Sequence, residues 1–115
     1  MDECLKCPAV RGIMAKKRYN KLLHVAEEVA GYKMDKTRSY RSVLLRRFIA
    51  CKMRDEDFTV CDIATAMGVH HATICHYLQQ MRDCVDEPIF YAKELDLYFK
   101  FIEYVRDEDS AVVPS

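Results

Sequence analysis

Residues that interrupt helices are scarce in this sequence, which has three Gly and three Pro among 115 residues and no Trp. The β-branched residues are scattered and do not alternate with polar ones, so a sheet is disfavoured and an all-α fold is expected. No apolar run approaches the ~18 residues that span a bilayer, which predicts no membrane partner. A chain of this length has room for one domain with one modest core.

Other absences exclude whole classes of function. Residues 1–15 carry early acidic residues and no apolar block, so the sequence predicts no secretory signal and a cytoplasmic protein. No GxxxxGK[ST] motif occurs, so neither a nucleotide nor an ATPase core is expected. No third group is placed to orient a Cys or His nucleophile, and neighbours in a helix point about 100° apart. The sequence therefore predicts a binding protein without a cofactor, not an enzyme.

The net charge of zero hides a strong asymmetry. Residues 1–54 hold 14 Lys and Arg against 5 Asp and Glu, whereas residues 55–115 hold 4 against 13. A basic front half can attract phosphates. The alternative is that solvated helix faces simply differ in charge.

Six cysteines raise the question of disulfides or metal. Four of them lie among apolar residues of predicted helices and are expected to be reduced core residues: Cys51, Cys61, Cys75 and Cys84. Cys4 and Cys7 form a lone CxxC. A structural zinc site usually needs a second such pair, so a simple N-terminal dithiol is favoured over a metal site.

Apolar periodicity predicts five helices, over about 14–31, 40–54, 60–67, 70–83 and 88–106. The helical domain is thus expected over 14–106. The segments on either side, 1–13 and 107–115, are expected to be a flexible N-terminus and a disordered acidic tail.

Residues 58–80, FTVCDIATAMGVHHATICHYLQQ, are the most informative stretch. Thr59 is a plausible N-cap, with Asp62 at the third helical position to complete a capping box. Gly68 allows the positive φ of a tight turn, and a second helix restarts near His70 or His71. Four apolar residues of this second helix are expected to face the core: Ile74, Leu78, Met81 and Val85. Two short helices joined by such a turn are typical of a helix-turn-helix.

The predicted last helix carries two apolar stripes, and a helix of this kind needs two partners. One stripe contains Leu95 and Val105 and is expected to face the core. The other is expected to face the first helix, a second copy or another protein: Phe90, Leu97, Phe101 and Tyr104.

The stretch from about 19 to 102 resembles the C-terminal DNA-binding domain, domain IV, of the bacterial replication initiator DnaA. The family signature places a Gly-rich turn before Asp-His-Thr-Thr-Val and a later His. Here GVHHATICH is similar, with His71, Thr73, Ile74 and His76 at matching positions, and DIATAMG matches the preceding helix. The resemblance implies a Trp-repressor-like, all-α fold of about five helices that binds double-stranded DNA and controls replication or transcription.

The sequence departs from the family at the turn. His70 stands where the family has Asp, Ala72 replaces the first Thr, and the turn appears one residue shorter and lacks the family's Arg. In the family, the turn Asp caps the recognition helix and helps to read a base. The target sequence of this chain therefore does not follow from the resemblance.

The sequence therefore predicts selective binding of duplex DNA, with the helix from about residue 70 to 80 in the major groove. The candidate base contacts are His70, His71, Ala72, Thr73 and His76. The candidate contacts to the backbone or minor groove are Lys36, Arg38, Arg41, Arg46 and Arg47. The helix has no Lys or Arg before Arg82, so affinity is expected to depend on the basic residues upstream.

Two alternatives accompany this prediction. The three clustered histidines could suggest a metal, but no two of them have the i, i+4 spacing of a zinc helix, so none is expected to bind one. A protein-interaction module that kept the fold without DNA binding would instead use Phe90, Leu97, Phe101 and Tyr104.

Overall fold

Five α-helices form the part of the chain that the structure describes, which confirms the predicted all-α fold. The computed structural model describes residues 8–35 and 39–112, with side chains described for 12–35 and 39–109. The helices are α2 (Pro8–Ala30), α3 (Tyr40–Asp55), α4 (Val60–Met67), α5 (His71–Asp86) and α6 (Ala92–Val112). No described helix combines the length and apolar composition needed to cross a membrane.

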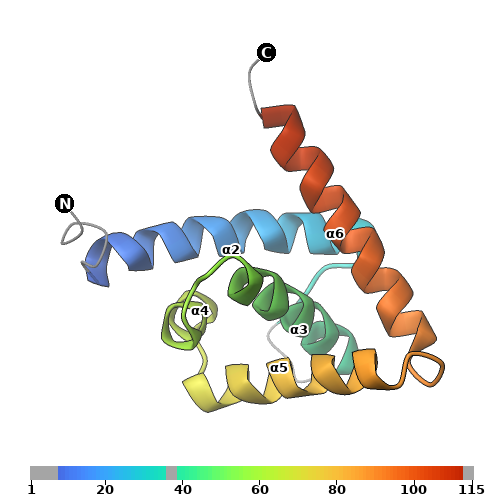
Figure 1. Ribbon diagram of the computed structural model, residues 1–115. Helices are drawn as coiled ribbons and strands as arrows, with labels where there is room; N and C mark the ends of the chain where they lie inside the picture. The colour runs from blue at the N-terminus through green and yellow to red at the C-terminus, as the bar shows by residue number, and fades with distance from the viewer. Residues whose placement is uncertain (1–7, 36–38, 113–115) are drawn as a thin grey trace.

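Helix α3 lies at the centre of the molecule. Helix α2 packs across it and also contacts α4 and α6, while α5 packs along α3 on the other side (Figure 1). Phe48 of α3 lies in the core with its ring centroid 5.3 Å from Tyr98 and 6.2 Å from Phe101, both from α6. The core is completed mainly by Leu22, Leu45, Ile49, Met53, Ile63 and Ile74. Because α3 is covered by helices on several sides, it holds α5 in a fixed position.

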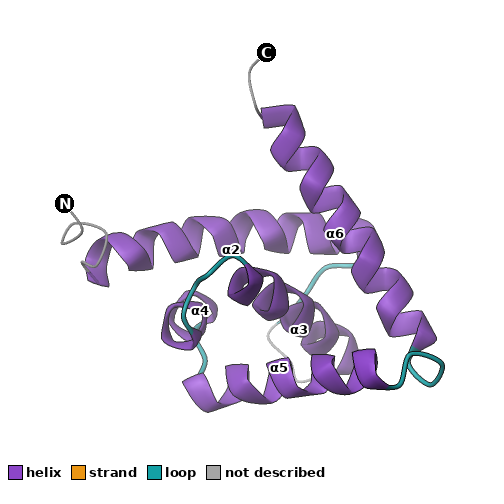
Figure 2. Ribbon diagram, in the orientation of Figure 1, coloured by secondary structure: helices purple, strands orange, loops and turns teal. Residues whose placement is uncertain are grey.

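The loops are short and have clear local causes (Figure 2). Gly31 ends α2 with a φ of 82°, and its N–H donates to the Glu27 carbonyl at 2.9 Å. The side chain of Ser39 caps α3 by accepting from the N–H of Ser42. Asp57, with a φ of 72°, makes the turn into α4.

Helices α2 and α6 are longer at their outer ends than expected. Helix α2 begins at Pro8 and not near 14, because Pro is favoured at the first helical position. The first seven residues, with Cys4 and Cys7, lie outside the described part of the chain. Because α6 continues to Val112, the prediction of a disordered tail from residue 107 is wrong over the described residues.

An ion cluster explains why α6 continues. Arg18 of α2 donates to both carboxylate oxygens of Glu56, at 2.7 and 2.5 Å, and also to those of Asp109, at 3.2 and 3.1 Å. Lys21 reaches Asp109 at 3.1 Å. The hydrogen bonds from Arg18 and then Lys21 lower the pKa of Asp109, so the carboxylate is favoured in the folded protein. The cluster joins the end of α6 to α2.

Some residues expected in the core are exposed. Val85 was expected to lie in line with Ile74 on the core side of α5, yet 62% of its surface is exposed, whereas the adjacent Cys84 is buried. At this end of α5 the side that faces the core therefore contains Cys84 and not Val85. Among the cysteines, Cys61 and Cys75 are exposed, Cys51 is half-buried and Cys84 is buried. The expectation of four core cysteines is therefore wrong for Cys61 and Cys75.

Candidate nucleic-acid interface

Helices α4 and α5 are joined by a three-residue turn with well-formed caps. Thr59 and Asp62 exchange hydrogen bonds, with the Thr59 N–H donating to the carboxylate at 3.3 Å and the Asp62 N–H donating to the hydroxyl at 3.1 Å. This is the expected capping box. Gly68 ends α4 with a φ of 73°, and the N–H of Val69 returns to the Ala64 carbonyl at 3.0 Å. These bonds fix the direction in which α5 leaves the turn.

His70 is the N-cap of α5, immediately after Gly68 and Val69 of the turn. Its Nδ1 accepts a hydrogen bond from the backbone N–H of Ala72 at 3.1 Å. A ring nitrogen of histidine accepts such a bond through its lone pair, so it takes the place of the oxygen acceptor usual at an N-cap. The His71 ring lies against it, with centroids 4.3 Å apart and planes inclined by 30°. The side chain that caps the helix is thus also part of a stacked pair at its exposed end.

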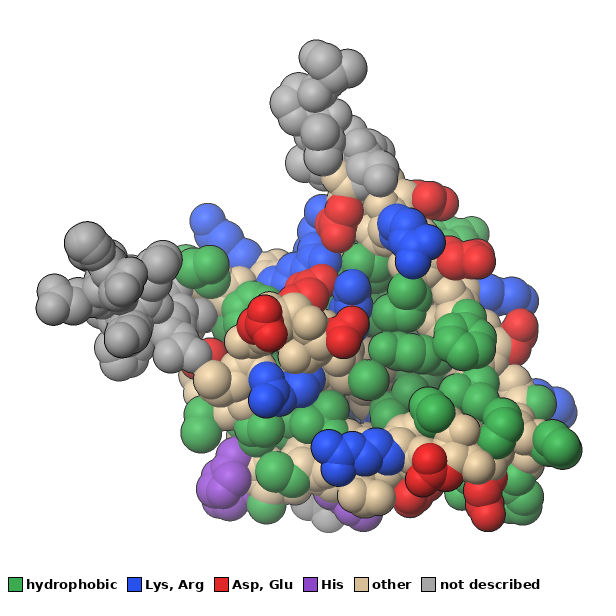
Figure 3. All heavy atoms as spheres, viewed as in Figure 1, with side chains coloured by type: hydrophobic (Ala, Val, Ile, Leu, Met, Phe, Trp, Pro, Cys, Tyr) green, Lys and Arg blue, Asp and Glu red, His purple; other side chains and the backbone are tan. Residues whose placement is uncertain are grey.

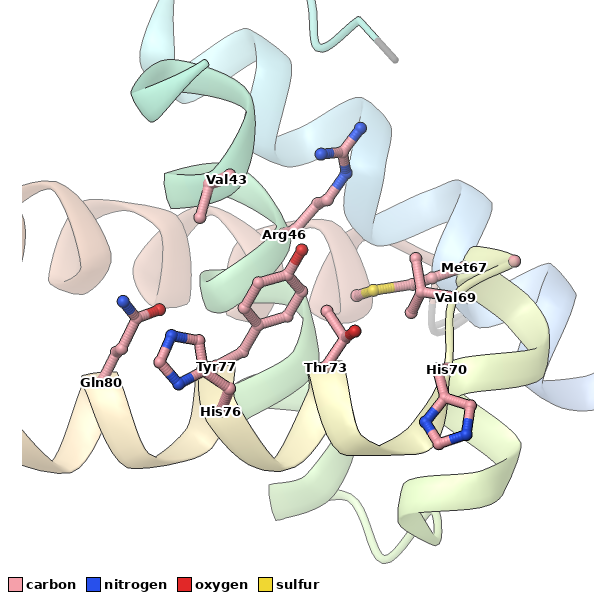
Figure 4. A pocket seen from close by; sticks show the side chains of 10 residues that line it. Val43, Arg46, Met67, Val69, His70, Thr73, His76, Tyr77 and Gln80 are labelled. Atoms are coloured by element: carbon pink, nitrogen blue, oxygen red, sulfur yellow. The ribbon is translucent and has the colours of Figure 1, made fainter. Parts of the chain in front are cut away.

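A cavity of about 940 Å³ lies between α3, the turn and the amino-terminal half of α5 (Figure 4). Its polar lining residues are Arg46, His70, Thr73, His76, Tyr77 and Gln80. In Figure 4 the ring of Tyr77 lies between Arg46 of α3 and His76 of α5. The cavity therefore brings together four of the predicted site residues from two helices and the turn.

The loop before α3 is held against the rim of this cavity. A guanidinium nitrogen of Arg46 donates to the Asp35 carbonyl at 2.7 Å, and the Ser42 hydroxyl donates to the Asp35 carboxylate at 2.8 Å. The Arg41 guanidinium lies 4.0 Å from the centroid of the Tyr32 ring, which stacks it on the same loop. Lys36 and Arg38 lie outside the described residues.

Arg47 does not belong to this surface, which corrects one predicted backbone contact. Only 7% of its surface is exposed, and its Nε is buried without a hydrogen-bond partner among the described residues. It follows Arg46 by one residue, so the two side chains point about 100° apart. Arg47 consequently faces the inside of the molecule and cannot reach an external phosphate in this conformation.

The remaining predicted base contacts, His71 and Ala72, are exposed but do not line the cavity. They lie at the first two positions of α5, beside the cap. The site thus has two parts, an exposed helix end and a polar cavity along the same helix, and His70 belongs to both.

Two cavity residues were not among the predicted site residues. Gln80 follows His76 by four positions and Thr73 by seven, so helical spacing alone would have placed it on the same face. Tyr77 is largely buried, and part of its ring lines the cavity. The sequence does not give the position of α3 relative to α5, and that position decides which side of α5 lines the cavity.

The predicted second apolar stripe of α6 is divided by the fold. Phe101 is completely buried in the core, Leu97 is half-buried, and Phe90 and Tyr104 are exposed. Phe101 therefore cannot contribute to a docking surface. Phe90 precedes α6 and lies in the turn at 87–91, because α6 begins at Ala92 and not near residue 88.

No group of three or more His, Cys, Asp or Glu able to hold a metal ion occurs among the residues whose placement is described. No protein-family model, no curated protein and no solved structure matches the chain.

Proposed function

We propose that this chain binds duplex DNA selectively through a helix-turn-helix made of α4 and α5. The observation that carries the proposal is the cavity along α5, where His70, Thr73 and His76 share one side with Arg46 of α3. An exposed, capped helix end next to a polar cavity suits a helix that enters the major groove by its amino-terminal turns. Replication or transcription control is the process that the resemblance to the initiator domain suggests.

In this proposal the end of α5 contacts the bases. The exposed residues His71 and Ala72, together with Thr73 and His76, would face base edges or thymine methyl groups. Each good contact of this kind contributes about 1–3 kcal/mol of discrimination between bases. Replacing His76 by Ala should therefore weaken binding to the preferred site more than binding to random DNA.

Phosphate contacts would come from the other side of the cavity. Arg46 and Arg41 are fixed to the loop by the Asp35 carbonyl and the Tyr32 ring. Charges that are already oriented lose little conformational freedom when they meet a phosphate. Because α5 contains no Lys or Arg before Arg82, these upstream arginines would supply much of the salt-dependent affinity.

The test measures affinity for random and selected duplexes at several salt concentrations. Each phosphate contact that is removed should reduce the magnitude of the slope of log K against log salt by about one. Arg41→Ala and Arg46→Ala should therefore each give a shallower slope than the wild type. Arg106→Ala is the matched control, since it removes an exposed arginine of α6. Absence of binding at low salt by a folded protein would refute the proposal and favour the protein-interaction module.

A further inference from the structure

The most exposed large apolar residues of the described surface lie at the turn between α5 and α6. Ile89 is 93% exposed and Phe90 is 78% exposed, and Val85 just before them is 62% exposed. Two adjacent large apolar side chains so exposed are unusual for a stable monomer. DNA binding in the proposed mode does not use them, because they follow the opposite end of α5.

A second cavity, of about 650 Å³, opens beside this turn. Apolar lining comes from Leu78, Met81 and Val85 of α5 and Tyr98 of α6, and the charged lining residues are Arg54, Asp55, Asp57, Arg82 and Asp86. Figure 3 shows apolar side chains gathered over α6 and the adjoining end of α5. The molecule thus has a protruding apolar turn next to a cavity with one apolar wall and a charged rim, and Val85 contributes to that wall.

We propose that two copies of this chain pair through these features, the turn of each copy entering the cavity of the other. Ile89 and Phe90 are exposed, so they do not fill the cavity of their own chain. In a twofold pair the same patch serves on both sides, which requires a self-complementary surface. The exposed turn and the cavity lie on either side of Val85 and provide that complementarity. The twofold axis of the pair would therefore pass near Val85.

Two charged residues at the rim of the cavity are also self-complementary. Arg82 and Asp86 both line the cavity and lie four residues apart on α5. Across a twofold axis passing between them, Arg82 of one copy faces Asp86 of its partner, and the reverse. No like charges need meet between these positions, so the rim favours a second copy of this chain as the occupant.

Sedimentation of the full chain without DNA tests the pairing. We expect the wild type to have about twice the mass of one chain, and Phe90→Asp and Val85→Asp to shift it to the monomer. Ile13→Asp is the matched control, because it places the same charge at a residue 58% exposed near the amino-terminal end of α2. That end of α2 lies on the opposite side of Figure 1 from the turn between α5 and α6. A wild type that stays monomeric up to about 100 μM would overturn the proposal. So would a dimer that survives Phe90→Asp.

A charge exchange provides a second test that does not depend on folding of the apolar variants. Arg82→Asp alone and Asp86→Arg alone should each be monomeric, because like charges would then face one another twice. Mixing the two variants should restore a dimer, since both facing pairs become attractive. If mixing restores nothing, the proposed twofold arrangement is wrong. These outcomes are independent of DNA binding, so either proposal can fail without the other.

Discussion

The two flanks of α5 differ in chemistry although they belong to one 16-residue helix. The flank that carries Thr73 and His76 borders the cavity next to Arg46, and the flank that carries Leu78 and Val85 borders the cavity next to Tyr98. At about 100° per residue, the two sets lie about 120–180° apart around the helix axis. The core covers only the strip between them, where Ile74 and Met81 are buried. A short helix can thus present two separate surfaces while one narrow stripe anchors it.

The largest expected contrast is the reactivity of two thiols on α5. Cys75 is exposed, whereas Cys84 is 1% exposed, and burial raises the pKa of the Cys84 thiol. Cys84 should react with a thiol reagent only after local opening, on the order of a thousandfold more slowly. Peptide mapping by mass spectrometry after timed labelling measures both rates in one sample. Under the proposed function, duplex DNA should slow Cys75 and leave Cys84 unchanged; equal rates without DNA would contradict the burial described.

A second contrast concerns stability. Met81→Ala should lower the free energy of unfolding by about 2–5 kcal/mol, because Met81 is buried and its removal leaves a cavity. His76→Ala on the polar flank should change it by less than about 0.5 kcal/mol, since His76 is exposed. Urea denaturation monitored by circular dichroism gives both values. A large loss from His76→Ala would show that the polar flank also carries the fold.

The two caps on either side of the turn can be compared by removing each acceptor in turn. Thr59→Ala should cost about 1 kcal/mol, because it removes the hydroxyl that accepts from the Asp62 N–H. His70→Ala should also lower the free energy of unfolding, because it removes the Nδ1 acceptor of the Ala72 N–H. His70→Asp keeps an acceptor and places a negative charge at a helix N-terminus, so it should be at least as stable as the wild type. Thermal unfolding of the three variants gives the comparison, and a His70→Ala variant as stable as the wild type would contradict this role of His70.

The smallest expected effect lies away from both cavities. Asp109→Asn removes a carboxylate paired with Arg18 and Lys21, and solvent screens it, so the loss should be at most about 1 kcal/mol at neutral pH. Because pairing lowers the pKa of Asp109, its contribution is present above the ordinary range of a carboxyl and disappears as the pH falls through the lowered value. Chemical denaturation of both proteins at pH 7 and at about pH 3 measures the difference, which should shrink at the lower pH.

Local signals predicted the central elements well. The bounds of α4 agree with the expected 60–67, because the Thr59 capping box and Gly68 mark both ends within the sequence itself. The start of α5 at His71 likewise follows from the turn. Such caps are formed by neighbours in the chain, so they do not depend on the packing of distant segments.

Tertiary packing decided what the sequence could not predict. Val85 and Phe101 both belong to apolar stripes, yet Val85 is exposed and Phe101 is fully buried. Phe101 packs on Phe48 of α3, whereas the core at the end of α5 lies on the side of Cys84. Arg46 and Arg47 are adjacent and equally basic, but the Arg46 side chain lines the cavity whereas the Arg47 side chain is buried. Periodicity identifies a face of a helix, whereas burial also requires that another element reach it.

The length of α5 fixes the distance between the two DNA-contacting helix ends in the proposed dimer. Thr73 and Val85 are twelve residues apart, which corresponds to about 18 Å along the helix axis. Two α5 helices lying antiparallel across a twofold axis at Val85 would place their Thr73 residues about 36 Å apart along the helix direction, close to one turn of B-DNA. Selection from random duplexes should then yield inverted repeats whose centres are about ten base pairs apart. Inserting one helical turn between Tyr77 and Met81 would lengthen that spacing and require a correspondingly longer operator.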